Sequence, residues 1–309
     1  MHALPLSFEE RISRIRLWIL PLVVLTAGFA VDLLGRLCHL SEVADDRAVR
    51  LTLYVSAFSW WVLRAAPRPL SVRATLGRAP DLAGWSSVAL LLFADTCLVF
   101  LYLTIQFCWR LHLKGVTIST IRFPFTMNIT LDRGSSTVLD AALRTIVLAP
   151  IVEELVFRGT IFRKWRVRIG PGKAALLTTL LFSALHVDYV TAFSAGLTML
   201  MLYAHIRSLA AAMVFHAGCN IVSLLQTYVW PPRLTFQSAW AFGTYLLILV
   251  LIAGAWLRFV RRSWPTLGAP LPPDGAGHTR GPSRATGRRQ PAQVVVEEVS
   301  KSSSETWAS

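Results

Sequence analysis

Two adjacent glutamates, Glu153 and Glu154, lie inside a hydrophobic run of membrane-spanning length over residues 138–162. A charged side chain near the centre of a bilayer costs about 2.5–3.5 kcal/mol on insertion scales. Neighbouring carboxylates also repel each other, so at least one of them needs a counter-charge or a proton. Ionisable residues placed in a membrane in this way typically mark a functional site.

Helical geometry gives the two carboxylates different surroundings. Glu154 and Arg158 are four residues apart, so they share one helix face and can form an ion pair. Glu153 points about 100° away from Glu154 and has no local partner. We therefore expect a structural pair, Glu154 with Arg158, beside a free carboxylate. The alternative is that both carboxylates pair with arginines of neighbouring helices and serve packing alone.

Two further hydrophobic segments carry side-chain pairs at the i,i+4 spacing of a helix: an aromatic with a histidine, Phe182 and His186, and two polar residues, His216 and Asn220. Counted from the nearest basic flank, Glu153 lies at a depth of about 15 Å, His216 at about 13 Å and His186 at about 20 Å. Three helices can therefore bring a carboxylate, two imidazoles and an amide together. The alternatives are a satisfied core histidine for His186 and helix-packing contacts for His216 and Asn220.

These groups suit peptide hydrolysis by an activated water molecule. A carboxylate and an imidazole can together deprotonate water. A second imidazole and an amide can donate hydrogen bonds to a developing oxyanion. The sequence has no GxSxG motif for a serine nucleophile and no HExxH motif for a zinc protease. We predict no metal and no cofactor, with a metal held by Glu and His side chains as the alternative.

Composition indicates a polytopic membrane protein. Of the 309 residues, 54% are hydrophobic and 16% are charged, and the mean hydropathy is +0.52. In a soluble protein a net charge of +14 would suggest nucleic-acid binding, but here the basic residues lie between hydrophobic runs and no recognition motif accompanies them. They indicate membrane topology and contact with anionic lipid at the cytoplasmic face, and we expect no nucleic-acid partner.

Apolar runs of about 20 residues predict about eight transmembrane helices. The runs are residues 17–36, 48–66, 83–108, 138–161, 174–190, 190–206, 209–230 and 238–259. Lysine and arginine are more frequent at the flanks that share a side with the N-terminus, which predicts that both termini are cytoplasmic. The Arg- and Ala-rich composition favours a bacterial inner or plasma membrane. The predicted fold class is therefore an all-α, multi-pass membrane protein.

The chain divides into three predicted segments. Residues 1–137 hold N-terminal transmembrane helices and, from residue 110, an interfacial strand or loop; residues 138–260 hold the candidate catalytic helices. Residues 263–309 are rich in Pro, Gly, Ser and Arg, so we expect a disordered tail. The four cysteines have no CxxC spacing and predict neither a disulfide framework nor a zinc finger.

Three motifs follow one another within the hydrophobic runs. They are EExxxR at Glu153, Glu154 and Arg158, FxxxH at Phe182 and His186, and HxxxN at His216 and Asn220. Over about residues 138–225 this combination resembles the CAAX-protease and bacteriocin-processing family of intramembrane proteases, also called the Abi family. The resemblance implies an eight-helix, CAAX-protease-like bundle.

The resemblance also implies roles for these residues. Glu153 and His186 would activate water, and His216 with Asn220 would form the oxyanion hole. The remaining residues, Glu154, Arg158 and Phe182, would support the site.

We therefore expect an intramembrane glutamic endopeptidase that cleaves a membrane-embedded or lipidated protein. By resemblance its substrate is a C-terminal CAAX-like tail, a sorting-signal tail or a bacteriocin. The alternatives are a non-catalytic immunity or binding protein, a metal-dependent protease that uses the same Glu and His residues, and a proton-relay transporter. The intact motifs favour the enzyme, and a transporter would more often show paired repeats or broken helices.

Overall fold

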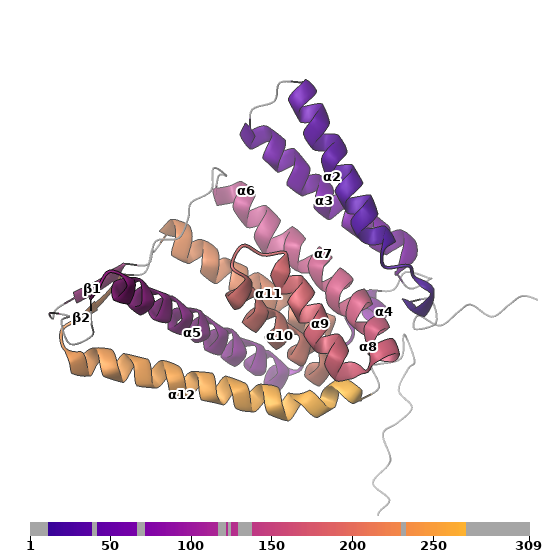
Figure 1. Ribbon diagram of the computed structural model, residues 1–309. Coiled ribbons are helices and arrows are strands. Elements are labelled where there is room, and N and C mark those ends of the chain that lie inside the picture. Colours follow the sequence, from indigo (N-terminus) through magenta and orange to yellow (C-terminus); the bar gives the residue numbers. More distant parts are fainter. Residues whose placement is uncertain are drawn as a thin grey trace, which may run out of the picture. The chain divides into compact units, whose positions relative to one another are not determined.

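The computed structural model describes residues 12–38, 42–66, 72–116, 122, 125–128, 138–229 and 233–269, which are almost entirely helical (Figure 1). All of them belong to the first of two units into which the chain divides, residues 1–275. The predicted tail lies outside the described residues from position 270 onward. The all-α, polytopic fold class is confirmed, while the predicted segment boundaries at residues 137 and 260 stay predictions.

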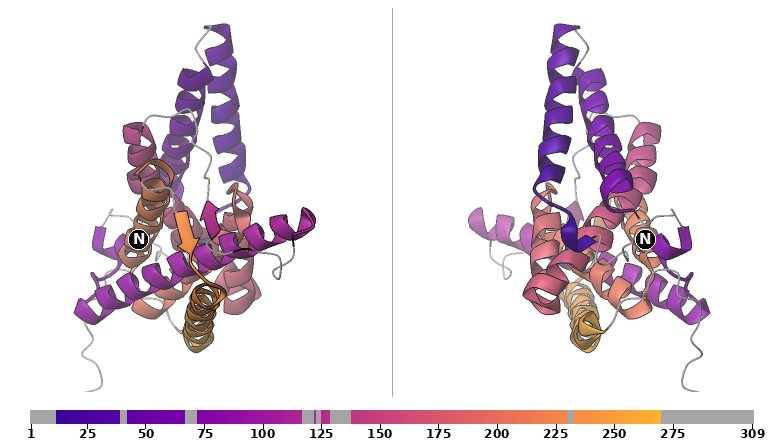
Figure 2. Two further views of the ribbon diagram at one scale, coloured as in Figure 1. Left: turned by 90° about the vertical axis from the view of Figure 1, so that its left-hand side faces the viewer. Right: turned by 90° about the vertical axis from the view of Figure 1, so that its right-hand side faces the viewer.

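The first two long helices, α2 (Ile19–Leu37) and α3 (Glu42–Arg64), pack against each other (Figures 1 and 2). Gly28 permits the close approach, since a Cβ atom there would lie 2.8 Å from Cδ2 of Leu53. The apolar side chains of α2 are largely exposed, as expected for a helix that faces lipid. The short helix α4 (Val72–Leu76) follows α3.

Two long helices, α5 (Leu82–Leu113) and α12 (Ala239–Ser263), also pack together. Strands β1 (Phe125–Asn128) and β2 (Arg233–Phe236) pair in antiparallel register, with Phe125 opposite Phe236 (Figure 1). β1 lies within residues 110–137, for which the sequence predicted an interfacial strand or loop.

One unbroken helix runs over residues 138–169 and carries the two glutamates. It consists of α6 (Val138–Ala142), the π-helical η2 (Leu143–Leu148), α7 (Ala149–Val156), the π-helical η3 (Phe157–Phe162) and α8 (Arg163–Ile169). Pro150 explains the first π-helical segment, because proline has no N–H and its ring would clash with the carbonyl four residues earlier. Gly170, at φ +84°, ends the helix.

Three helices follow and enclose the core, α9 (Pro171–Ala184), α10 (Tyr189–Ile206) and α11 (Leu209–Leu224). Asp188 caps α10 by accepting a hydrogen bond from the Thr191 amide, and Ser208 caps α11 in the same way. The buried side chains concentrate on α10, so this helix is the centre of the packing. The π-helical η4 (Leu225–Val229) extends α11, and the 3₁₀ segment η5 (Trp264–Gly268) extends α12.

The break between the fifth and sixth predicted spans corrects one expectation. The sequence predicted a helix over residues 174–190, but α9 ends at Ala184 and a turn over 185–188 precedes α10. The Ser183 hydroxyl donates to the Tyr189 carbonyl across this turn, and Asp188 begins the next helix. The Ser183 hydrogen bond and the Asp188 cap of α10 explain why α9 ends at Ala184, before the predicted end at residue 190.

Within the described residues, five helices are long and apolar enough to cross a membrane. They are Ile19–Leu37, Leu82–Leu113, Tyr189–Ile206, Leu209–Thr227 and Ala239–Gly268. The other three predicted runs are helical too, but α9 has 14 residues, and α3 and the helix over residues 138–169 carry several charged residues. The total of eight spans therefore stays a prediction.

Candidate active site

The Glu154 carboxylate joins two elements of the core. It is fully buried, and its Oε1 accepts hydrogen bonds from Nη1 of Arg158 at 2.8 Å and from Nδ1 of His216 at 3.0 Å. Arg158 is also fully buried. The 2.8 Å contact is the ion pair expected from the four-residue spacing. Because His216 lies on α11, this one oxygen connects α11 to the glutamate-bearing helix.

Arg158 extends the network to α10 and α9. Its Nη2 donates to the Gly196 carbonyl at 2.8 Å, and its guanidinium lies 4.5 Å from the ring centroid of Phe182. Gly196 has no side chain, which this approach requires: a Cβ atom there would lie 3.0 Å from the Phe182 ring and 3.5 Å from Nη2 of Arg158. Phe182, expected to support the site, therefore holds the arginine by a cation–π contact.

Glu153 faces in a different direction from Glu154, as predicted. Its Oε1 accepts a hydrogen bond from the Tyr54 hydroxyl of α3 at 3.3 Å. Its Oε2 lies 3.8 Å from Nε2 of His186 and 4.0 Å from Nε2 of His216. The two imidazoles thus converge on one carboxylate oxygen, and both distances are longer than a direct hydrogen bond.

His186 lies in the turn after α9 and not inside a helix, contrary to the expectation from the sequence. Its Nδ1 nevertheless lies 2.8 Å from the Phe182 carbonyl oxygen. A carbonyl can only accept, so Nδ1 carries a proton, and in the neutral ring Nε2, the nitrogen on the side of Glu153, is the acceptor. The turn leaves the His186 side chain 34% exposed, while the His216 side chain is only 5% exposed.

His216 and Asn220 share one face of α11, as their spacing predicted. An ionised Glu154 can only accept, so Nδ1 of His216 donates to it and Nε2 points toward Glu153. The Asn220 side-chain nitrogen donates to the Thr145 carbonyl of η2 at 2.6 Å. That contact assigns the amide orientation and leaves one of its two N–H groups for another acceptor.

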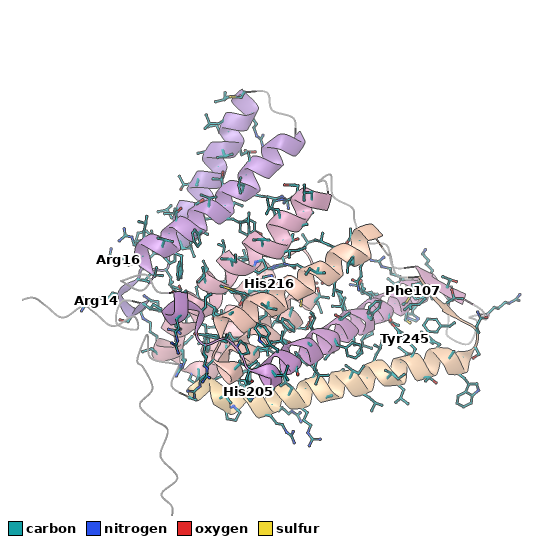
Figure 3. All side chains as sticks on the ribbon, turned by 180° about the vertical axis from the view of Figure 1, so that it is seen from behind. Arg14, Arg16, Phe107, His205, His216 and Tyr245 are labelled. Carbon is teal, nitrogen blue, oxygen red and sulfur yellow. The ribbon has the colours of Figure 1, made fainter. Side chains whose placement is uncertain are left out.

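A cavity of about 310 Å³ adjoins these groups between α5, α10, α11 and the turn after α9. Its lining includes Phe182, His186, His216 and Asn220. Most of its other walls are apolar, among them Val99, Leu103, Met199 and Val222. His205, at an exposed position in the last turn of α10, lies apart from His216 (Figure 3).

Two polar residues of this region were missed in the sequence. Tyr54 lies 99 positions from Glu153, and no local spacing relates the two. Asp95 of α5 is 3% exposed, lines the same cavity and lies 3.8 Å from the Cys219 sulfur. An acidic residue in the middle of the apolar run 83–108 was a usable signal, the same one that identified the glutamates.

The described residues contain no group of three or more His, Cys, Asp and Glu side chains arranged to hold a metal ion. Whether the site works without a metal stays a prediction, which the chelation experiment below tests.

The two glutamates should differ in their effect on stability. Glu154→Gln leaves the buried Arg158 charge without its ion-pair partner, which should destabilise the protein by about 3–5 kcal/mol. Glu153→Gln keeps the side-chain shape and removes no ion-pair partner of Arg158, so it serves as the matched control. Melting in detergent and extracted yield measure the difference. Equal losses for the two variants would contradict this division of roles.

Residues 135–222 match the family model described as "Type II CAAX prenyl endopeptidase Rce1-like". No curated protein and no solved structure matches the chain. The matched segment contains all three motifs and every side chain that converges on Glu153 except Tyr54. The segment that carries the site is therefore Rce1-like, which confirms the resemblance to the CAAX-protease and bacteriocin-processing family.

Proposed function

We propose that this multi-pass membrane protein is an intramembrane endopeptidase whose attacking water is activated by Glu153 and His186. The observation that carries the proposal is the convergence of two imidazole nitrogens on the Glu153 carboxylate, at 3.8 and 4.0 Å from Oε2. Such separations suit a water molecule that hydrogen-bonds to more than one of these groups.

The protonation pattern supports this division of labour. Nδ1 of His186 donates to the Phe182 carbonyl, so its Nε2 and the Glu153 carboxylate are both acceptors. A water molecule between them can donate one hydrogen to each, which orients an oxygen lone pair toward a substrate carbonyl. As the water oxygen bonds to the carbonyl carbon, its proton passes to Glu153 or His186. That proton then goes to the amine nitrogen as the C–N bond breaks.

The developing oxyanion needs donors, and α11 supplies two candidates. Asn220 keeps one N–H after donating to the Thr145 carbonyl. His216 donates through Nδ1 to Glu154, so Nε2 can donate to the oxyanion only when the ring is doubly protonated. A doubly protonated His216 would bridge the Glu154 carboxylate and the oxyanion. In this proposal His216 stabilises the negative charge of the oxyanion, and His186 accepts and returns the proton of the water molecule.

The substrate class follows from the cavity and from the family. Apolar walls around the catalytic groups suit hydrophobic side chains or a lipid chain beside the scissile bond. We propose a membrane-embedded or lipidated protein substrate with a C-terminal CAAX-like or sorting-signal tail. The alternative, an immunity or binding protein, predicts capture of the same hydrophobic peptide without cleavage.

We further propose a bacterial inner or plasma membrane with both termini cytoplasmic. Ile12 and Ser13, which precede α2, and Gly268, which ends the last candidate span, line a common cavity. This arrangement supports termini on one side of the membrane. The excess of Arg and Lys at the same flanks supports the cytoplasmic assignment.

Glu153→Gln should reduce hydrolysis by about 10²–10⁴-fold, because the amide keeps the shape but is not a base. The assay is cleavage of single-span substrates with C-terminal tails in proteoliposomes, with products identified by mass spectrometry. Asp32→Asn is the matched control, since Asp32 pairs only with the exposed Arg36 on α2 in the described structure. Near-normal turnover in Glu153→Gln would exclude Glu153 as the base. Binding without cleavage by the wild type would favour the immunity alternative.

Tyr54→Phe should lower kcat by about three- to tenfold with little change in KM. The hydroxyl donates to Glu153 at 3.3 Å. Its loss lets the Glu153 carboxylate adopt other orientations but does not remove the base. Tyr102→Phe is the control, because its hydroxyl contacts Gln106 on the same helix. Equal kcat values for the two variants would remove Tyr54 from the positioning role.

Activity should survive prolonged treatment with EDTA or phenanthroline, since a carboxylate and an imidazole can activate water without a metal. The same cleavage assay gives the readout, and elemental analysis of the purified protein supplements it. Loss of cleavage that zinc restores would favour the metal-dependent alternative using the same Glu and His residues.

A further inference from the structure

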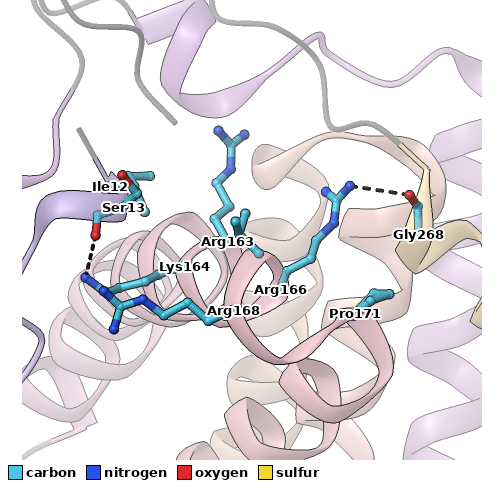
Figure 4. Close-up of a pocket in the computed structure, with 9 residues that line it drawn as sticks. Ile12, Ser13, Arg163, Lys164, Arg166, Arg168, Pro171 and Gly268 are labelled. Atoms are coloured by element: carbon cyan, nitrogen blue, oxygen red, sulfur yellow. Dashed lines mark hydrogen bonds between the residues drawn. The ribbon is translucent and has the colours of Figure 1, made fainter. Parts of the chain in front are cut away.

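The contacts between helices distinguish two ends of the helical bundle. At the first, called the α8 end, the segment before α2, helix α8 and the 3₁₀ segment η5 enclose a cavity of about 300 Å³ (Figure 4). Nε of Arg163 donates to the Tyr203 hydroxyl at 2.7 Å, which places the end of α10 here. A Cβ atom on Gly84 would lie 3.7 Å from Cγ2 of Ile206, so α5 begins here. The first and last described residues, 12 and 269, lie at the same end.

The opposite end, called the β1–β2 end, holds the later part of α5 and the turn after α9. The Thr104 hydroxyl of α5 lies 3.0 Å from the Tyr245 hydroxyl of α12, and the Tyr245 ring centroid lies 5.1 Å from that of Phe236 in β2. Tyr102, on the same helix as Thr104, interacts electrostatically with Asp188. The turn after α9 is therefore level with the part of α5 that adjoins the strands.

The cavity beside the candidate site occupies the half of the bundle nearer the β1–β2 end. Apart from Phe182, its lining residues fall within 95–103 of α5, 186–188 of the turn, 191–199 of α10 and 216–226 of α11 and η4. Asp95 lies about 20 Å along the axis of α5 from Leu82, where the helix begins. α10 ends at Ile206 and α11 begins at Leu209, both at the α8 end, so their lining parts are also displaced toward the strands.

The exposure of the lining residues increases toward the β1–β2 end. In the middle of the bundle, Met199 is 1% exposed and His216 is 4% exposed. Val187 of the turn is fully exposed, and Asp188 and Ser223 are exposed as well. The floor of the cavity is therefore at the candidate catalytic side chains, and its mouth lies between the turn after α9 and the last turns of α11.

A packed layer separates this floor from the α8 end. Residues 200–204 of α10 are at most 3% exposed, and Leu209, Ala211 and Ala212 of α11 are at most 2% exposed. Phe162 of η3 is fully buried in the same layer, where its ring contacts that of α10 residue 203. The two cavities share no lining residue. The exposed mouth and the packed layer together direct access to the β1–β2 end.

We infer that the substrate enters from the membrane face at the β1–β2 end, opposite the face where the described chain starts and ends. The inference rests on the proposed function and specifies its substrate: a membrane protein whose scissile bond lies in the half of the bilayer next to that face. The lining fits such a chain as it passes from lipid to water, because Val99 and Leu103 are apolar while Asp188 and Gln226 are polar. With both termini cytoplasmic, this is the non-cytoplasmic face.

The first test labels thiols in the full chain, in sealed membrane vesicles that expose one face or the other. Ser223→Cys places a thiol at the exposed mouth, and Arg261→Cys, at an exposed position near the end of α12, reports the α8 end. A bulky, membrane-impermeant maleimide is the probe, and peptide mass spectrometry separates its adducts from those of the four native cysteines. We expect the two variants to react from opposite faces. Labelling should abolish cleavage by Ser223→Cys and leave that by Arg261→Cys unchanged.

The second test uses two single-span substrates that share one tail sequence but have opposite orientations in the membrane. Mass spectrometry should find the cut only in the substrate whose tail lies at the face from which Ser223→Cys reacts. Cleavage of only the other substrate would overturn the inference and keep the proposed function.

The labelling also decides the inference without a substrate. Reaction of both variants from one face, or of Ser223→Cys from neither face, would overturn it. If the wild type cleaves neither substrate while the two variants react from opposite faces, the proposed function fails and the assignment of the cavity mouth stands.

Discussion

The buried ion pair of Glu154 and Arg158 is the constraint on which the site depends. Both side chains are fully buried, so each charge needs its partner close by. Glu154 and Arg158 form their ion pair within one helix turn. Their other hydrogen bonds join Glu154 to His216 on α11 and Arg158 to the Gly196 carbonyl on α10. A single local pair thereby fixes three helices relative to one another.

The geometry of the candidate site follows from this pair through direct contacts. The Arg158 guanidinium lies over the Phe182 ring, and the Phe182 carbonyl holds Nδ1 of His186. On the other side, the Glu154 carboxylate holds Nδ1 of His216. Each imidazole is therefore held at Nδ1, which directs both Nε2 atoms toward Glu153. Glu153 can stay available for chemistry because its neighbour carries the structural role.

One helix joins two chemically opposite regions. Over residues 138–169 it carries the carboxylates of α7 and, about 15 Å further along the axis, the cations of α8. The carboxylate end meets apolar walls and imidazoles, and the cationic end meets two segments at the ends of candidate spans. A membrane protein needs this separation, because charges in the apolar layer require internal partners while cations at its edge can use lipid phosphates.

The sequence by itself determined which side chains meet within one helix turn, and it contains the family motifs. Glu154 pairs with Arg158 because a four-residue spacing puts them on one face of any α-helix. Only the tertiary structure decided the position of His186 beyond the end of α9, the hydrogen bond from Tyr54 and the presence of Asp95 in the cavity beside the candidate site. These relations join residues up to 124 positions apart, and helical periodicity carries no information about which face of one helix meets another. The packing of neighbouring helices and the capping of helix ends determine where these side chains lie.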